Sequence, residues 1–294
     1  MTDRHAPAPP LSERRRILRR VANNRLALLG AVIIVLLIGL AVLGPFIAPY
    51  PPNEINMGAR VQPPSVAHPF GTDDFGRDVF SRVLAGARVS IYVGLVAVGI
   101  SLLAGTSLGL ISGYYGGWAD EVIMRAMDVL FSFPAILLAI AIVAALGPGV
   151  TNAMIAIGVV YTPIFARITR GSVLAVRKEV YVDAARSIGS ADRRILLRHI
   201  LPNIAAPIIV ETTLSLAFAI LSEAALSFIG LGAQPPDPSW GRMLSEGRSF
   251  IQQAPWIGIF PGLAIMITVM GFNFLGDGLR DALDPKLKQV LENG

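Results

Sequence analysis

Few residues in this 294-residue chain are suited to catalysis or metal binding. The chain contains no cysteine, which excludes disulfides, thiolate metal sites and cysteine nucleophiles. Its three histidines, His5, His68 and His199, are too scattered along the sequence to indicate a metal cluster. The P-loop pattern G-x-x-x-x-G-K-[ST] does not occur, so we expect no ATP hydrolysis through that motif. These absences predict a non-enzymatic chain without a metal or other cofactor.

One short motif does match an enzyme class. Gly105-Thr106-Ser107-Leu108-Gly109 fits the G-x-S-x-G elbow of serine hydrolases. A serine nucleophile needs a base within hydrogen-bonding reach, and all three histidines lie outside the expected membrane spans. Gly105, Gly109 and Gly113 also recur every four residues, the spacing that lets membrane helices approach closely. We therefore expect helix packing here, with an intramembrane serine hydrolase around Ser107 as the alternative.

The composition indicates which kind of secondary structure carries these motifs. Hydrophobic residues make up 53% of the chain and charged residues only 15%, against about 25% charged in soluble domains. Apolar stretches near the ~20 residues that cross a bilayer recur along the sequence. They lie at 26–45, between Arg88 and Asp120, twice between Asp128 and Arg167 around Gly147-Pro148-Gly149, at Ile204–Ser222 and at Trp256–Leu275. The sequence predicts an all-α membrane protein with six transmembrane helices.

Basic residues predict the orientation of these helices. About three quarters of the 25 Lys and Arg residues fall in segments on the same side as the N-terminus. Both termini are therefore expected in the cytoplasm. The basic stretch Glu13–Arg20 is expected to lie on anionic lipid rather than on nucleic acid. The resulting division is a basic segment at 1–25, a first span at 26–45, an extracytoplasmic loop at 46–88, a five-helix core at 89–276 with a cytoplasmic loop at 167–203, and a cytoplasmic tail at 277–294.

The cytoplasmic loop 167–203 has a pattern of its own. Tyr181, Ala184, Ala185 and Ile188 share one helical face, and Gly189 suits the left-handed position that ends a helix. We expect a second short helix to follow, capped by Ser190 and ended by Pro202 where the fifth span begins. The small residues in the middle of the first face would let a partner approach its backbone closely.

This loop resembles a motif of a known family. Asp183-Ala184-Ala185, Gly189 and Leu201-Pro202 have the spacing of the E-A-A-x-x-x-G…L-P loop of ABC-importer permeases. Two positions depart from that motif, because Asp183 replaces its Glu and His199 replaces its usual isoleucine.

Two further stretches narrow the resemblance to the permeases of dipeptide, oligopeptide and nickel importers. The first runs from His68 to Asp78 and on to Ser90, before the second span, and the second runs from Ala225 to Gly241. With these, the resemblance extends from Arg14 to Lys288, and it is greatest to the C-type subunit of that group. It implies the six-helix bundle of type I (MetI-like) importers, in the inner membrane of a prokaryote.

The resemblance also implies partners and site residues. A second, unlike permease, one or two ABC ATPase subunits and an extracytoplasmic solute-binding protein would join this chain in the lipid bilayer. The helix at 178–188 would sit in a cleft of one ATPase. Asp183 and Arg186 would make polar contacts there, Ala184 and Ala185 close-packed ones, and Gly189 would provide the bend, while Tyr181 and Pro202 complete the coupling set. The solute is left open among peptides, glutathione, nickel chelates and related small molecules.

Three expectations concern the rest of the chain. Asp78 to Ala87 would form a short amphipathic helix that either plugs the bundle or docks a binding protein. Trp240 is expected to anchor a rigid loop at the membrane surface. Glu211 is the one ionisable residue expected within a span, where it would snorkel, pair with a partner or line the solute pathway. A stand-alone secondary transporter remains a further alternative.

Overall fold

The computed structural model describes residues 24–283, and this part of the chain consists of helices and loops without a β-strand. The expectations for the basic stretch Glu13–Arg20, for His5 and for the tail beyond residue 283 lie outside the described residues. Within them, the prediction of an all-helical protein is confirmed.

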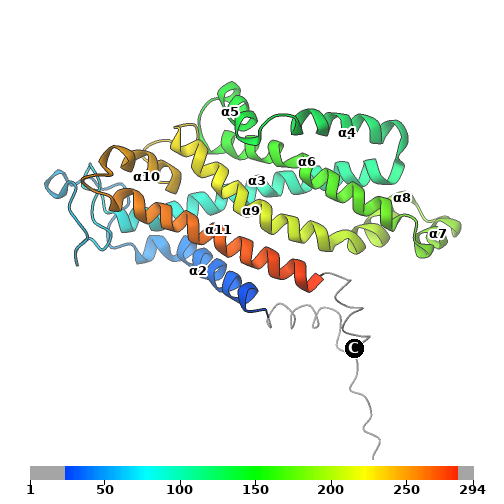
Figure 1. Cartoon of the computed structure of the whole chain (residues 1–294), viewed down its shortest axis with the longest axis horizontal. Coiled ribbons are helices and arrows are strands. Elements are labelled where there is room, and N and C mark those ends of the chain that lie inside the picture. The colour runs from blue at the N-terminus through cyan, green and yellow to red at the C-terminus, as the bar shows by residue number, and fades with distance from the viewer. Residues whose placement is uncertain (1–23, 284–294) are drawn as a thin grey trace, which may run out of the picture.

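Long helices run along the long axis of the molecule and pack side by side (Figure 1). Five of them have the length and apolarity to cross a membrane, and a bent helix pair raises the number to six. The long helices are α2 (Arg25–Ile47), α3 (Val79–Tyr115), α6 (Val150–Val176), α9 (Ala205–Phe228) and α11 (Trp256–Leu283). The bent pair is α4 (Gly117–Phe131) and α5 (Ala135–Leu146), which meet at 93°.

Shorter elements close the two ends of this bundle (Figure 1). The α10 end carries α10 (Trp240–Gly247), the 3-10 turns η1 (Met57–Ala59) and η4 (Arg248–Phe250), and the loop that precedes α3. The α7 end carries α7 (Val180–Ser187), α8 (Asp192–Arg194), the π-helical turn η2 (Ile195–Ile200) and the 3-10 turn η3 (Leu201–Ile204). Helix α2 begins and α11 ends on the side of the bundle that carries α7 (Figure 1).

Helix α3 packs closely against α6 through its glycines. A Cβ atom added at Gly105 would lie 2.5 Å from the Cβ of Phe165, and one added at Gly109 would lie 2.5 Å from the carbonyl oxygen of Ala166. At Gly113 the nearest atom would be the Cβ of Val173, at 2.8 Å. Larger residues at these three positions would push the two helices apart.

Three element boundaries differ from the sequence-based expectations. The stretch from Val79 to Ala87 is not a separate short helix, because it forms the first turns of the 37-residue helix α3. The third span does not begin after Asp128, since α4 starts at Gly117 and includes four charged residues. Pro202 does not end a helix, because a proline in the first turn of a helical segment lacks only a hydrogen bond that is unmade there anyway. The helical path therefore runs from Asp192 through two irregular turns into α9.

Candidate functional site

Helix α7 ends in a hydrogen-bonded cap at Gly189. This glycine has a φ of +76°, which an L-residue rarely adopts. The amide of Ser190 donates to the carbonyl of Ala185 at 3.1 Å, and the amide of Gly189 donates to the carbonyl of Arg186 at 3.0 Å. These two bonds form a Schellman motif, so the backbone conformation expected at Gly189 is the one observed. The cap of the next helix is Ala191 instead of Ser190, and no side chain bonds to it.

The exposure of α7 separates a structural side from a free side. Val182 and Ala185 are buried against the rest of the chain. Tyr181, Ala184 and Ile188 are exposed, with 82% of Ile188 accessible. The predicted shared face is therefore split, because Ala185 belongs to the buried side and the other three residues project away from the bundle.

Charged groups flank this free side. Arg186 Nη1 lies 3.2 Å from Asp183 Oδ1, and both side chains are largely exposed. Partial burial, and secondarily the nearby Glu179 carboxylate, raise the pKa of the Tyr181 phenol above its usual value. The tyrosine therefore stays neutral at physiological pH and presents a hydroxyl that can donate or accept a hydrogen bond. The free side of α7 thus offers small, apolar and charged groups for contact with another molecule.

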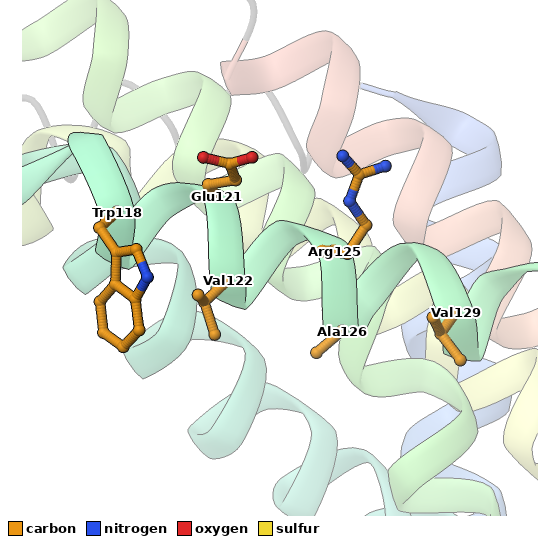
Figure 2. Close-up of a pocket in the computed structure, with 6 residues that line it drawn as sticks. All are labelled: Trp118, Glu121, Val122, Arg125, Ala126 and Val129. Carbon is orange, nitrogen blue, oxygen red and sulfur yellow. The ribbon is translucent and has the colours of Figure 1, made fainter.

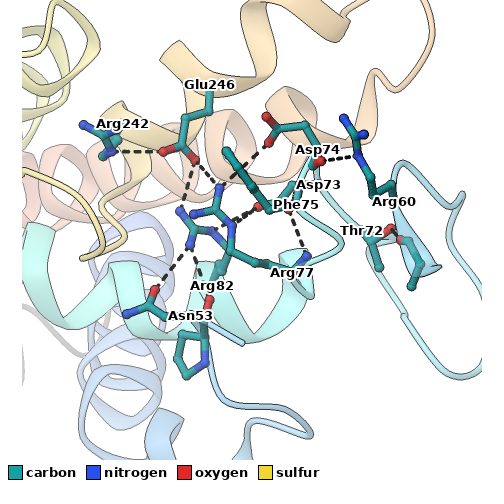
Figure 3. A network of polar contacts seen from close by, with 12 residues as sticks. Asn53, Arg60, Thr72, Asp73, Asp74, Phe75, Arg77, Arg82, Arg242 and Glu246 are labelled. Atoms are coloured by element: carbon teal, nitrogen blue, oxygen red, sulfur yellow. Dashed lines mark hydrogen bonds and ion pairs between the residues drawn. The ribbon is translucent and has the colours of Figure 1, made fainter. Parts of the chain in front are cut away.

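The charged residues at the α10 end lie inward instead (Figure 3). Arg77 Nε donates to Asp73 Oδ2 at 2.6 Å, and Arg77 Nη2 donates to Glu246 Oε2 at 3.1 Å. Arg82 Nη2 reaches the same Glu246 oxygen at 3.1 Å, and only 1% of Arg82 is exposed. Arg242 donates to the other Glu246 oxygen at 2.9 Å. We call these residues, together with Asp74, the α10-end network.

Neighbouring residues extend this buried polar region. The Asp78 carboxylate caps α3 by accepting from the Ser81 amide at 2.8 Å, and its other oxygen lies 2.9 Å from His68 Nδ1. Burial and the adjacent Asp73 carboxylate raise the pKa of Asp74. The sequence left the stretch from Asp78 to Ala87 open between a plug and a docking surface. Its charged side chains, Asp78 and Arg82, bond to other groups within the chain, which favours the plug.

Trp240 belongs to the core of the molecule. It is 1% exposed, and its indole Nε1 donates to the carbonyl of Val83 at 3.0 Å. Its ring lies against Gly86, where an added Cβ would lie 3.0 Å from the Trp240 Cδ1 atom. The expectation of an interfacial anchor is therefore wrong, because this residue clamps α10 onto the start of α3.

Two glutamates of α9 lie within the bundle, where the sequence predicted one. Glu211 is half-buried and accepts a hydrogen bond from Ser215 Oγ at 3.0 Å. Glu223 is 1% exposed and accepts from Ser90 at 3.0 Å and from Ser227 at 2.7 Å. Glu223 was not predicted within a span, because the fifth span was expected to end at Ser222, whereas α9 continues to Phe228. Ser227, four residues after Glu223, was the feature of the sequence that could have indicated a hydrogen-bonded glutamate within a helix.

Among the described residues, Ser107 makes no hydrogen bond with another side chain, and it lies on the exposed side of α3. The same part of the chain holds no group of His, Cys, Asp or Glu arranged to bind a metal ion. The side chains brought together most densely are those of the α10-end network, and those left most open are on α7.

The arrangement of helices is similar to that of a membrane protein of known structure. A chain of the MetNI methionine ABC transporter in an inward-facing conformation superposes with a TM-score of 0.57 at 18% identity, covering 69% of this chain and 96% of that one. At this level of identity the likeness shows the fold alone.

Sequence relatives cover nearly the whole chain. The dipeptide transport system permease protein DppC of Alkalihalophilus pseudofirmus is 53% identical over 93% of this chain and 90% of its own length. The glutathione transport system permease proteins GsiD of Pectobacterium atrosepticum and of Escherichia coli O6:K15:H31 are 48% and 50% identical over 92% of this chain, and over 90% and 89% of their own lengths.

Two family models match consecutive parts of the sequence. Residues 12–64 match the N-terminal transmembrane domain of oligopeptide transport permease C. Residues 105–289 match the binding-protein-dependent transport system inner membrane component. With helices that can span a membrane five or six times, and with relatives that are named transport system permease proteins, the chain belongs to the inner membrane components of binding-protein-dependent transport systems.

Proposed function

We propose that this chain forms half of the solute pathway of an ATP-driven importer for dipeptides, oligopeptides or related small solutes. The second half would come from an unlike permease. Relatives at about 50% identity that carry dipeptide and glutathione transport names support this solute class. The excess of basic residues supports a location in the cytoplasmic membrane with the α7 end inside. A solute-binding protein would then deliver the solute at the α10 end.

The observation that carries the proposal is the free side of α7. Tyr181, Ala184 and Ile188 are exposed on a helix anchored by only two buried residues. Because Ala184 is small, a partner helix or cleft can approach the backbone there. Asp183 and Arg186 provide charges that complementary groups on the partner would pair with.

The position of α7 in the chain supports a coupling role. It lies between α6 and α9, so a force on α7 acts on two of the spanning helices. Partner ATPases would supply that force, since the sequence carries no P-loop. To switch the permease between two states, the ATPase must bind one state several kcal/mol more tightly, since a shift from 1:99 to 99:1 takes about 5.5 kcal/mol.

Cysteine crosslinking tests this proposal directly, because the chain has no native cysteine. Ala184→Cys, treated with a short bifunctional thiol reagent in native vesicles, is expected to capture a P-loop ATPase, identified by mass spectrometry. Val35→Cys is the matched control, because Val35 is exposed on α2 and lies far from α7 in sequence. If Ala184→Cys captures no ATPase, or Val35→Cys captures it equally well, the coupling role of α7 is refuted.

A further inference from the structure

Helix α4 lies antiparallel along α6 and is held there by two ion pairs. Arg170 Nε donates to Asp120 Oδ1 at 2.6 Å, nearer the α7 end. Arg167 Nη2 donates to Asp128 Oδ1 at 2.7 Å, farther from that end. Because the partners run in opposite order along the two helices, α4 follows α6 instead of lying across the end of the bundle. The view in Figure 1 agrees with this placement.

The exposed surface of α4 has a polar stripe and an apolar stripe. Glu121 and Arg125 project to one side of the helix, whereas Trp118, Val122 and Val129 project to the other (Figure 2). Asp128 and Ser132 continue the first side at the spacing of helix turns, and all four polar residues are exposed. We call Glu121, Arg125, Asp128 and Ser132 the polar stripe. Neither Glu121 nor Arg125 forms an ion pair with another described residue.

The Asp128–Arg167 pair lies away from the ends of both helices that point to the α7 end. At 1.5 Å per residue, Asp128 lies about 16 Å along α4 from its start, and Arg167 lies about 14 Å from the end of α6 at Val176. Trp118 is 79% exposed in the first turn of α4.

An exposed ion pair on a helix that can span a membrane favours an environment other than lipid. Asp128 and Arg167 have 56% and 39% of their side chains exposed, although they contact each other. The Arg167 guanidinium also lies 4.2 Å from the centre of the Phe131 ring, which covers one of its faces. Ionisable residues within membrane-spanning helices face protein or a water-filled cavity, because contact with hydrocarbon is costly. The polar stripe repeats exposed polar side chains on one side of α4 from Glu121 to its C-cap Ser132.

We propose that the polar stripe of α4 and Arg167 of α6 line the solute pathway, and that Asp128 and Arg167 bind the ammonium and carboxylate groups of a zwitterionic solute. This inference rests on the importer function proposed above. Glu121, Arg125, Asp128 and Arg167 carry two charges of each sign, which suits a solute that is itself charged at both ends. Arg167 offers a planar donor pair that matches a carboxylate, and Asp128 accepts from an ammonium group. While no solute is present, the two side chains satisfy each other.

Water access to the stripe is tested by thiol labelling of the complete transporter. The assembly of both permeases, ATPases and binding protein is reconstituted in vesicles, and a charged methanethiosulfonate reagent is the probe. Ser132→Cys changes one atom of the stripe, and it is expected to react in at least one nucleotide state and to lose reactivity when transported dipeptide is added. Val66→Cys in the exposed loop is the reactive control, and Val35→Cys on α2 is the unreactive one.

The role of the charges is tested with blocked peptides. Arg167→Gln is expected to slow the uptake of a free dipeptide by about tenfold, the loss of one charge-assisted hydrogen bond, while uptake of its C-terminal amide changes little. Asp128→Asn is expected to affect recognition of the other end of the peptide. It should slow uptake of the free dipeptide more than uptake of its N-acetyl form. Each variant is compared with the unmodified transporter on the same peptide, so that the preference of the binding protein cancels. Arg170→Gln, which breaks the neighbouring pair, is expected to affect all three peptides equally.

Several outcomes would overturn the inference. Ser132→Cys as unreactive as Val35→Cys in every nucleotide state would mean that lipid or the second permease covers the stripe. Equal losses for free and blocked peptides in Arg167→Gln would mean that the pair only holds α4 against α6. An unmodified transporter that takes up no peptide would refute the proposed solute class instead, and the labelling of Ser132→Cys would still test whether the stripe faces water.

Discussion

The two ends of this permease use the same kinds of side chain in opposite ways. At the α10 end, the arginines and carboxylates of a conspicuous sequence motif lie inside the chain and bond to one another. At the α7 end, an arginine and an aspartate of an equally conspicuous motif lie on the surface, with only each other as an ionic partner among the described residues. A dense motif therefore does not by itself distinguish a structural cluster from a contact surface. Exposure does.

The difference has a physical cause in the surrounding elements. The α10-end network joins three segments, the loop before α3, the first turns of α3, and α10, so its charges are enclosed and must be paired. Helix α7 projects beyond the bundle and has two buried residues. Substitutions at the α10 end should therefore change the stability of the protein, whereas substitutions on α7 should change its coupling to a partner.

The largest loss of stability is expected from Arg82→Ala. Removal of this buried guanidinium leaves Glu246 without one of its arginine partners and Asn53 without a donor. Breaking a buried ion pair in this way costs about 3–5 kcal/mol. The measurement is thermal unfolding of the detergent-purified protein by scanning fluorimetry. Arg60→Ala is the control, because Arg60 is exposed and donates only to the Asp74 carbonyl, and a comparable loss there would contradict the importance of enclosure.

A smaller loss is expected from Glu223→Ala. This substitution leaves the buried Ser90 and Ser227 hydroxyls without their acceptor and opens a small cavity, at a cost of about 2–3 kcal/mol. Glu211→Ala on the same helix should cost less, because Glu211 is half-buried and has a single serine partner. The same unfolding assay compares the two variants. If Glu211→Ala is the more destabilising, burial does not rank these two glutamates.

The sequence was most informative where the signal is local. Gly189 ends α7 because a left-handed residue is needed there, and that need involves only its immediate neighbours. The recurring glycines of α3 lie close to α6, where their lack of a side chain leaves room for the neighbouring helix. Both features depend on residue type and spacing within one helix, which a sequence displays.

The sequence was least informative where distant segments meet. Nothing near Arg82 indicates that Glu246, far along the chain, accepts from it. The charged residues of α4 indicated a loop between two spans. In the structure its carboxylates pair with arginines of α6, and the sequence alone does not show which residues pair. Trp240 was expected at the membrane surface because its acceptor, the Val83 carbonyl, belongs to a different element. Long-range partners decide which polar residues face inward.

Two glycine caps at opposite ends of the bundle sharpen the comparison. Gly189 after α7 and Gly230 after α9 have φ values of +76° and +84°, and an added Cβ would meet no atom within 4 Å at either position. Valine at each should therefore introduce the same backbone strain, about 1–3 kcal/mol, without a clash. We expect Gly189→Val to abolish ATP-driven uptake with the protein still in the membrane, and Gly230→Val to lower stability while retaining uptake per molecule.

The control for this pair is asparagine, which tolerates the left-handed conformation. Gly189→Asn adds a side chain of similar bulk with less strain, so it should retain much of the uptake that Gly189→Val loses. Uptake by Gly189→Val at the level of the unmodified protein would show that the bend after α7 does not matter for transport. Loss of uptake in both valine variants at equal protein level would show that the two ends do not differ in this respect.

The smallest change in stability is expected from Arg186→Ala, although its effect on uptake should be large. The Asp183–Arg186 pair is exposed on both sides, and such pairs contribute about 0–1 kcal/mol. Unfolding should therefore be nearly unchanged, while ATP hydrolysis by the assembled transporter no longer drives uptake. Ser187→Ala is the matched control on the same helix, because its hydroxyl bonds only to the Asp183 carbonyl of its own chain. A strongly destabilised Arg186→Ala with normal uptake per folded molecule would reverse the assignment of the two ends, since the exposed arginine would then act as the buried ones do.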